Sequence, residues 1–132
     1  MTLVVDASVA TKWALDEEGS KRANALRNEP DLIAPALIAA EVGNALWKAV
    51  RYRSVPKREA LAAMGAFLAP FDHLVPSEDL RGRALELAMD LDHPIYDCFY
   101  IALAERENAP LITADERQLA VARKAKVKVR RL

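Results

Sequence analysis

The sequence has little that would cross-link it or hold it in a membrane. Its single cysteine, Cys98, cannot form an intramolecular disulfide, and its apolar neighbours are typical of a buried thiol. No apolar run approaches the roughly 18 residues that cross a bilayer, and the first residues do not show a basic start followed by a long apolar run. We therefore expect a cytoplasmic protein, in a reducing compartment, without membrane association.

An excess of charge of either sign is also absent. Lys and Arg total 19 and Asp and Glu total 19, so the formal net charge is +0 and does not indicate a nucleic-acid partner. The two histidines, His73 and His93, and Cys98 lack the spacing of zinc ligands, and we expect both histidines to be structural or surface residues. Hydrophobic residues make up 52% of the 132 residues, which predicts one globular domain over residues 1–132.

Short apolar strands alternate with helical patterns along the chain. Strands are expected at 3–6, 32–34, 73–76, 110–113 and 127–132, and helices at 7–15, 18–30, 35–53, 54–70, 77–92, 94–108 and 114–125. Pro35 is expected to open the third helix. The apolar residues of the fourth, such as Leu61, Met64 and Phe67, are expected to belong mostly to the core, although some of them could also face a partner. This alternation predicts an α/β fold with a mostly parallel sheet.

Two aspartates stand where predicted strands end and helices begin. Asp6 ends the first strand, and Asp115 closely follows the strand at 110–113. Ligand sites of open parallel sheets gather at such strand ends, so neighbouring strands would bring both carboxylates to one edge. Either residue could instead be a helix N-cap, and Asp115 with Gln118 three residues later resembles a capping box.

Two further carboxylates lie within predicted helices. Asp97 is the only charged residue of "PIYDCFYIALA" at 94–104, and a carboxylate in such apolar company needs a cation or hydrogen-bond donors. Glu41 lies off the apolar stripe of its helix, where it could equally be an ordinary exposed residue. Four carboxylates brought together would repel one another, and Mg²⁺ or Mn²⁺ would compensate that repulsion.

Four motifs in this order resemble those of the PIN domain family. They are "VVDASV" at 4–9, "AAEVGNAL" at 39–46, "YDCFYIALA" at 96–104 and "LITADERQL" at 111–119, so the resemblance covers essentially the full chain. Size and layout are similar to VapC-type ribonuclease toxins of bacterial and archaeal toxin–antitoxin pairs. The resemblance implies a PIN-like three-layer sandwich, with a mostly parallel sheet of about five short strands flanked by helices.

The resemblance also implies roles for the acidic residues. Asp6, Glu41, Asp97 and Asp115 would form the catalytic set, in which Asp6, Asp97 and Asp115 bind Mg²⁺ or Mn²⁺ directly. Glu41 would bind a second ion or orient the attacking water. The motif at 111–119 departs from the family, because Leu119 stands where many relatives have an aromatic residue and Gln118 offers no further carboxylate close to Asp115. This departure leaves the number of metal ions open.

Polar neighbours of these carboxylates would support them. Ser8 and Thr113 would orient the metal ligands, although they also suit a helix's first turn and a strand respectively. Asn44, one turn from Glu41, would steady that carboxylate or contact substrate, and is otherwise an ordinary exposed residue. Gln118 adds no carboxylate beside Asp115, whereas Glu116 could supply one.

Local basic clusters could position RNA beside an acidic site. Two such clusters lie at residues 48–58 and 123–132. The first is favoured, because Tyr52 between Arg51 and Arg53 could stack on an unpaired base. Alternatively, these charges could simply belong to a solvent-exposed surface without a binding role. The family resemblance further implies a homodimer and a cognate antitoxin that blocks the acidic site.

The sequence thus favours a metal-dependent endoribonuclease, the toxin of a type II toxin–antitoxin pair. An RNA-processing PIN nuclease without an antitoxin, and a binding module that keeps the fold without chemistry, are the alternatives. A phosphatase that uses Asp6 as nucleophile is disfavoured, because the sequence "DAS" lacks the second aspartate of the "DxD" pattern.

Overall fold

A computed structural model describes all 132 residues and contains one five-stranded sheet. The strands are β1 (Leu3–Val5), β2 (Leu32–Pro35), β3 (His73–Val75), β4 (Leu111–Thr113) and β5 (Val129–Arg131). Their order is β3-β2-β1-β4-β5, and every neighbouring pair is parallel. The prediction of a parallel α/β sheet is therefore confirmed. The basic strand β5 lies at an edge, where exposed charge hinders pairing with another chain.

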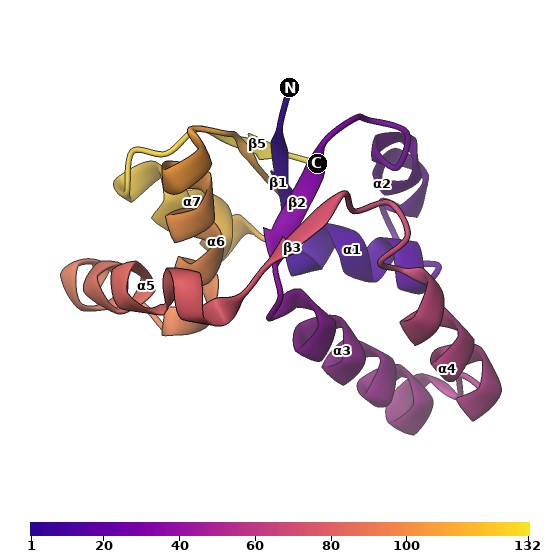
Figure 1. Cartoon of the computed structure of the whole chain (residues 1–132). Helices are drawn as coiled ribbons and strands as arrows, with labels where there is room; N and C mark the ends of the chain where they lie inside the picture. Colours follow the sequence, from indigo (N-terminus) through magenta and orange to yellow (C-terminus); the bar gives the residue numbers. More distant parts are fainter.

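Seven helices accompany the sheet. They are α1 (Ala7–Ala14), α2 (Ser20–Leu26), α3 (Ile38–Arg53), α4 (Lys57–Ala66), α5 (Ser77–Leu91), α6 (Ile95–Glu107) and α7 (Glu116–Lys124). The sheet forms the middle layer, with α1 and α2 on one side and α6 and α7 on the other, as Figure 1 shows. None of the helices combines the length and the apolar character that a membrane crossing requires.

The core consists of two apolar clusters on opposite faces of the sheet. The smaller one joins Leu3, Val5 and Ile112 to Val9 of α1 and Ala23 of α2. The larger one contains Val4, Ile33 and Leu111 together with most of α6, whose residues 100–104 are all buried. Because alternate strand residues face opposite sides, one short apolar run such as Leu3–Val5 serves both clusters.

The hairpin of α3 and α4 projects beyond the end of the sheet (Figure 1). Pro35 does not open α3 as expected: it pairs with Val75 as the last residue of β2, and the helix begins at Ile38. Proline is tolerated there because it ends its strand, and so removes no hydrogen bond from the interior of the sheet.

The expectation that the apolar residues of 54–70 lie mostly in the core is wrong for Leu61 and Met64 and right for Phe67. No residue of α4 is buried, and Leu61 and Met64 are 74% and 37% exposed, while Phe67 directly after the helix is 2% exposed. One face of the hairpin therefore remains open to solvent.

Candidate active site

Asp6 lies at the centre of a hydrogen-bond network where β1 ends. Its carboxylate is 5% exposed, and its Oδ2 atom accepts hydrogen bonds from the Ser8 backbone N–H (3.3 Å), the Ser8 hydroxyl (2.5 Å) and the Thr113 hydroxyl (3.0 Å). The parallel pairing of β1 with β4 brings Thr113 beside Asp6. Asp6 is also the N-cap of α1, so its capping role does not prevent the interaction with Thr113.

Gln118 of α7 contacts the other oxygen of the same carboxylate. Its Nε2 atom donates to Asp6 Oδ1 at 3.3 Å and to the backbone carbonyl of Asp97 at 3.2 Å. The predicted capping box with Asp115 is wrong, because the Asp115 N–H donates to Thr113 Oγ1 instead. Asp115 alone caps α7, by accepting from the Arg117 N–H at 2.9 Å.

Glu41 in the first turn of α3 turns toward α6. Its Oε1 atom accepts a hydrogen bond from the Tyr100 hydroxyl at 2.6 Å, and Tyr100 is fully buried. Asn44 lies exposed on α3 and is not the partner of Glu41. A buried tyrosine in an apolar helix needs a polar partner, and Glu41 supplies it.

Asp97 meets His93 within the chain. His93 Nε2 lies 2.7 Å from Asp97 Oδ2, and the side chains are 13% and 27% exposed. His93 is therefore a structural residue, as expected, but one that contacts an acidic residue of the site. Asp97 stands in the first turn of α6, where the partial positive charge of the helix N-terminus also favours a carboxylate.

Burial and mutual repulsion act on these carboxyl groups together. Burial, with a smaller contribution from the charges of Asp6 and Asp97, raises the pKa of Glu41 from 4.5 to about 7, although the hydrogen bond from Tyr100 opposes the rise. Burial also raises the pKa of Asp6 against its bonds from Ser8 and Thr113, with Asp97 adding to the rise. The charges of Asp6, Glu41 and Asp97 thus influence one another. No lysine or arginine forms a salt bridge with any of the three.

Cys98, the next residue after Asp97, behaves as a buried apolar group. It is 0% exposed, and burial followed by repulsion from Asp97 raises the pKa of its thiol to about 11. The thiol therefore stays protonated near neutral pH, and the sequence-based interpretation of Cys98 as a buried residue is confirmed.

The oxygen atoms of this site suit a hard divalent cation. Its carboxylates and the hydroxyls of Ser8 and Thr113 present oxygen atoms, which Mg²⁺ and Mn²⁺ prefer as ligands. No three Asp, Glu, His or Cys side chains converge closely enough to enclose a metal on their own, and Asp115 is exposed. Mg²⁺ commonly keeps several waters and binds directly to only one or two carboxylates, so the arrangement fits such an ion.

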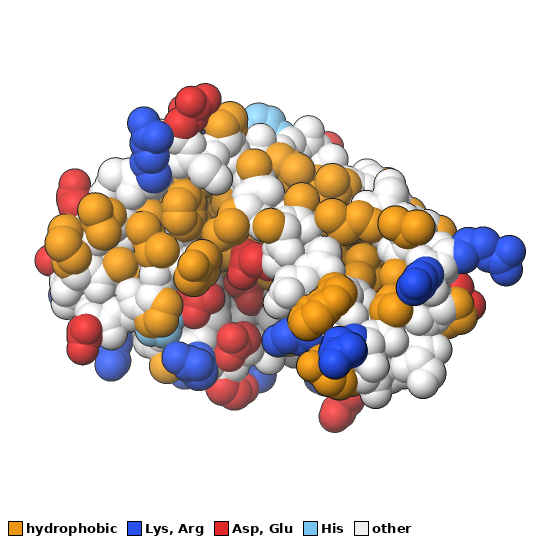
Figure 2. Space-filling view, turned by 90° about the horizontal axis from the view of Figure 1, so that it is seen from below, with side chains coloured by type: hydrophobic (Ala, Val, Ile, Leu, Met, Phe, Trp, Pro, Cys, Tyr) orange, Lys and Arg blue, Asp and Glu red, His pale blue; other side chains and the backbone are white.

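The end of the sheet where these residues lie is visible from below. Figure 2 shows acidic side chains in a hollow in the middle of this face, with apolar areas on both sides. Such a position, at the carboxyl ends of parallel strands, is where open α/β sheets bind ligands.

Three polar residues of this network were not expected from the sequence. His93 and Tyr100 stand four residues before and three after Asp97, and Gln118 stands three after Asp115. Helical spacing could have indicated Tyr100 as a neighbour of Asp97, but its actual partner is on another helix. The partners of Gln118 belong to two other elements, and no local pattern indicates them.

Comparison with known proteins identifies the family. Residues 3–124 match the PIN domain. The chain belongs to the PIN domain family. The PIN domain resembles "Ribonuclease VapC3" of Pyrobaculum aerophilum, with 36% identity over 124 residues that cover 91% of this chain and 93% of that protein. "Ribonuclease VapC1" of Mycobacterium tuberculosis is 37% identical over 89 residues, but the match spans only 66% of this chain and 65% of that protein.

Solved structures agree with this assignment. The crystal structure of PAE2754 from Pyrobaculum aerophilum aligns with a TM-score of 0.74 and 26% identity, over 98% of this PIN domain and 83% of that chain. VapBC2 from Rickettsia felis, bound to a DNA fragment from its promoter, aligns with a TM-score of 0.71 and 15% identity over 100% and 99% of the chains. At that identity the second likeness shows the fold alone.

The basic residues considered for RNA lie at the far end of α3. Arg51, Tyr52 and Arg53 are exposed, and the Arg51 guanidinium lies 5.5 Å from the centre of the Tyr52 ring. Arg53 is weakly paired with Glu17, at 3.5 Å. Ten residues of helix separate Arg51 from Glu41, which corresponds to about 15 Å along the axis of this PIN domain's third helix.

Proposed function

We propose that this PIN domain is a metal-dependent endoribonuclease that acts as the toxin of a toxin–antitoxin pair. The observation that carries the proposal is that Asp6, Glu41 and Asp97 lie near enough at one end of the sheet for burial and mutual repulsion to raise the pKa of Asp6 and Glu41, and that no basic side chain is paired with either of these two. The names of the VapC relatives support ribonuclease activity. A cytoplasmic location belongs to the same proposal, since its substrate would be cellular RNA.

The side chains of the site would divide the work. Asp6, Asp97 and Asp115 would hold Mg²⁺ or Mn²⁺, directly or through bound waters, and Glu41 would orient the attacking water or hold a second ion. A bound divalent ion would lower the pKa of water and offset the charge that develops on the phosphate. Ser8 and Thr113 would keep the Asp6 carboxylate in place through their hydrogen bonds.

Substrate RNA would need positive charge and stacking surface outside the acidic site. Arg51, Tyr52 and Arg53 offer both, because Tyr52 is 70% exposed and the two arginines are exposed beside it. Their distance from Glu41 suits contact with a flanking part of the RNA instead of the cleaved bond. Asn44, exposed one turn beyond Glu41, would contact RNA nearer the site.

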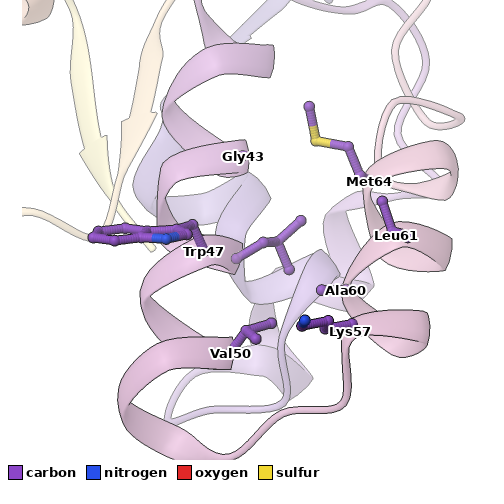
Figure 3. A pocket seen from close by; sticks show the side chains of 8 residues that line it. Gly43, Trp47, Val50, Lys57, Ala60, Leu61 and Met64 are labelled. Atoms are coloured by element: carbon purple, nitrogen blue, oxygen red, sulfur yellow. The ribbon is translucent and has the colours of Figure 1, made fainter.

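The antitoxin would occupy the groove between α3 and α4. Figure 3 shows that Gly43, Trp47 and Val50 line it from α3, and Leu61 and Met64 from α4. The groove has a volume of about 450 Å³ and an almost wholly apolar lining. The basic residues around the hairpin turn favour an apolar antitoxin segment with acidic flanks, and an arginine of the antitoxin could pair with the unpaired carboxylates.

RNA cleavage by purified protein tests the activity. With Mg²⁺ or Mn²⁺, end-labelled RNA should yield discrete fragments, and EDTA should abolish them. Asp97→Asn should reduce the rate by more than about 100-fold, since even residues that only support metal ligands contribute 10–100-fold.

Asp90→Asn is the matched control, because Asp90 is an exposed aspartate on α5 and its replacement removes the same charge. It should cleave like the wild type. Full activity of Asp97→Asn, or fragments that form equally in EDTA, would refute the proposed chemistry.

A further inference from the structure

Gln118 is an unusual residue for the buried side of α7. It is 0% exposed and lies beside Leu119, which is also buried. Its Nε2 atom has two hydrogen-bond partners, but its Oε1 atom is buried without any. An unpaired buried acceptor is unfavourable, and its presence in a native protein calls for an explanation.

The two oxygens of Asp6 are bonded unequally. Oδ2 accepts from three donors, two of Ser8 and one of Thr113, whereas Oδ1 accepts only from Gln118. Each carboxylate oxygen offers about two lone-pair positions. Oδ2 is therefore filled, and Oδ1 keeps one position open for a cation.

The amide of Gln118 has a determined orientation. Turning it by half a turn would place Oε1 against both the Asp6 carboxylate and the Asp97 carbonyl, which are acceptors themselves. The amide thus joins the end of β1 to the first turn of α6, the two places that carry Asp6 and Asp97.

We propose that Gln118 is a positioning residue, which presents Oδ1 of Asp6 to a divalent cation and holds Asp6 at a fixed separation from Asp97. This inference rests on the proposed metal-dependent function. Gln118 itself does not bind the cation, and it acts through the carboxylate to which it donates. Residues that orient metal ligands in this way typically affect metal affinity by about 10–100-fold.

Binding of Mn²⁺ to the full chain tests this role without RNA. Gln118→Met and Gln118→Leu replace the amide with an apolar side chain of similar size and remove both donated hydrogen bonds. Both should weaken Mn²⁺ affinity by about 10–100-fold in calorimetric titration and change the electron paramagnetic resonance spectrum of bound Mn²⁺. They should also reduce the rise in melting temperature that saturating Mn²⁺ produces in the wild type.

Val121→Ala separates a positioning role from a packing role. Val121 is buried on the same helix and contributes to the core, so its truncation should lower the melting temperature in EDTA but leave Mn²⁺ affinity and spectrum unchanged. If either Gln118 variant folds and binds Mn²⁺ with wild-type affinity and spectrum, the inference is overturned although the proposed function stands. If the wild type binds no Mn²⁺, the proposed function fails first, and this inference fails with it.

Discussion

Glu41 is placed where its negative charge is unfavourable unless a cation is near. Burial and the neighbouring Asp6 and Asp97 raise its pKa to about 7, and the Tyr100 hydroxyl only partly offsets them. Burial and the charge of Glu41 in turn raise the pKa of Tyr100 well above its ordinary value, so the phenol remains the hydrogen-bond donor. The Glu41–Tyr100 pair can therefore carry one negative charge, on Glu41, but the Tyr100 hydroxyl does not ionise beside it.

The metal-free protein should accordingly become more stable as the pH falls. Because the pKa of Glu41 is higher in the folded state than its ordinary value, the folded chain binds more protons between pH 4.5 and about 7. Its free energy of unfolding should rise as the pH decreases through this range, and Asp6, whose pKa is also raised, adds to the effect. Urea unfolding in EDTA at several pH values measures this slope.

Glu41→Gln should flatten the slope, because an amide does not titrate. Glu78→Gln, at an exposed glutamate of α5, serves as the control and should keep the wild-type slope. Equal slopes for Glu41→Gln and the wild type would contradict the electrostatic account of Glu41.

Among the elements, α3 and α4 form a hairpin in which α3 is the more deeply buried helix. Four residues of α3 are buried, whereas α4 has none. Gly43 permits a close approach, since a Cβ atom at this position would lie 3.2 Å from the end of the Met64 side chain. The groove between the helices is therefore open on its outer side, and its apolar lining is available to a partner.

Substitutions in the hairpin should separate partner binding from stability. Leu61→Glu should change the free energy of unfolding by no more than about 0.5 kcal/mol, because the side chain is exposed. Phe67→Ala, at a buried residue, should cost about 3–5 kcal/mol. Chemical denaturation of both variants measures these values.

The same Leu61→Glu variant should retain RNA cleavage but escape inhibition when the cognate antitoxin is added. Continued inhibition with wild-type affinity would exclude the α3–α4 groove as the binding surface. Loss of cleavage by the variant alone would instead show that α4 contributes to the active site.

At the scale of the whole molecule, a second apolar area lies apart from the hairpin. Leu85 and Met89 stand one turn apart on α5 and are 50% and 65% exposed, and Tyr96 at the start of α6 is 61% exposed. Contiguous exposed apolar surface commonly marks a protein interface. We propose that a second copy of the chain covers this surface in a homodimer.

Light scattering coupled to size-exclusion chromatography tests the assembly. The wild type should have the mass of a dimer, and Leu85→Glu should shift it to a monomer, because a charge would be buried in an apolar interface. Leu61→Glu, in the other apolar area, should remain dimeric. A monomeric wild type, or a dimer that Leu85→Glu leaves intact, would contradict this assignment of the surface.

Local sequence determined most of the fold. Short β-branched runs and helical periodicity predicted all five strands and all seven helices, because backbone propensity and the pattern of apolar residues act over a few neighbours. Asp6 and Asp115 could be recognised as candidate site residues because they follow predicted strands, and strands have a sequence signature. Asp97 could be recognised because it is a lone charge in an apolar helix. The boundary at Pro35 was misjudged, because proline is compatible with both a strand end and a helix start.

Only the tertiary structure decided how the site is completed. Whether Glu41 is an exposed helix residue or a half-buried, hydrogen-bonded carboxylate depends on Tyr100, 59 residues later. The position of Gln118 depends on Asp6, 112 residues earlier. The pairing of β1 with β4 sets the contact between Asp6 and Thr113. Such contacts arise from the packing of separate elements, and the spacing of residues within one element carries no record of them. Sequence by itself therefore determined which carboxylates are available, and packing decided which donors and charges surround each of them.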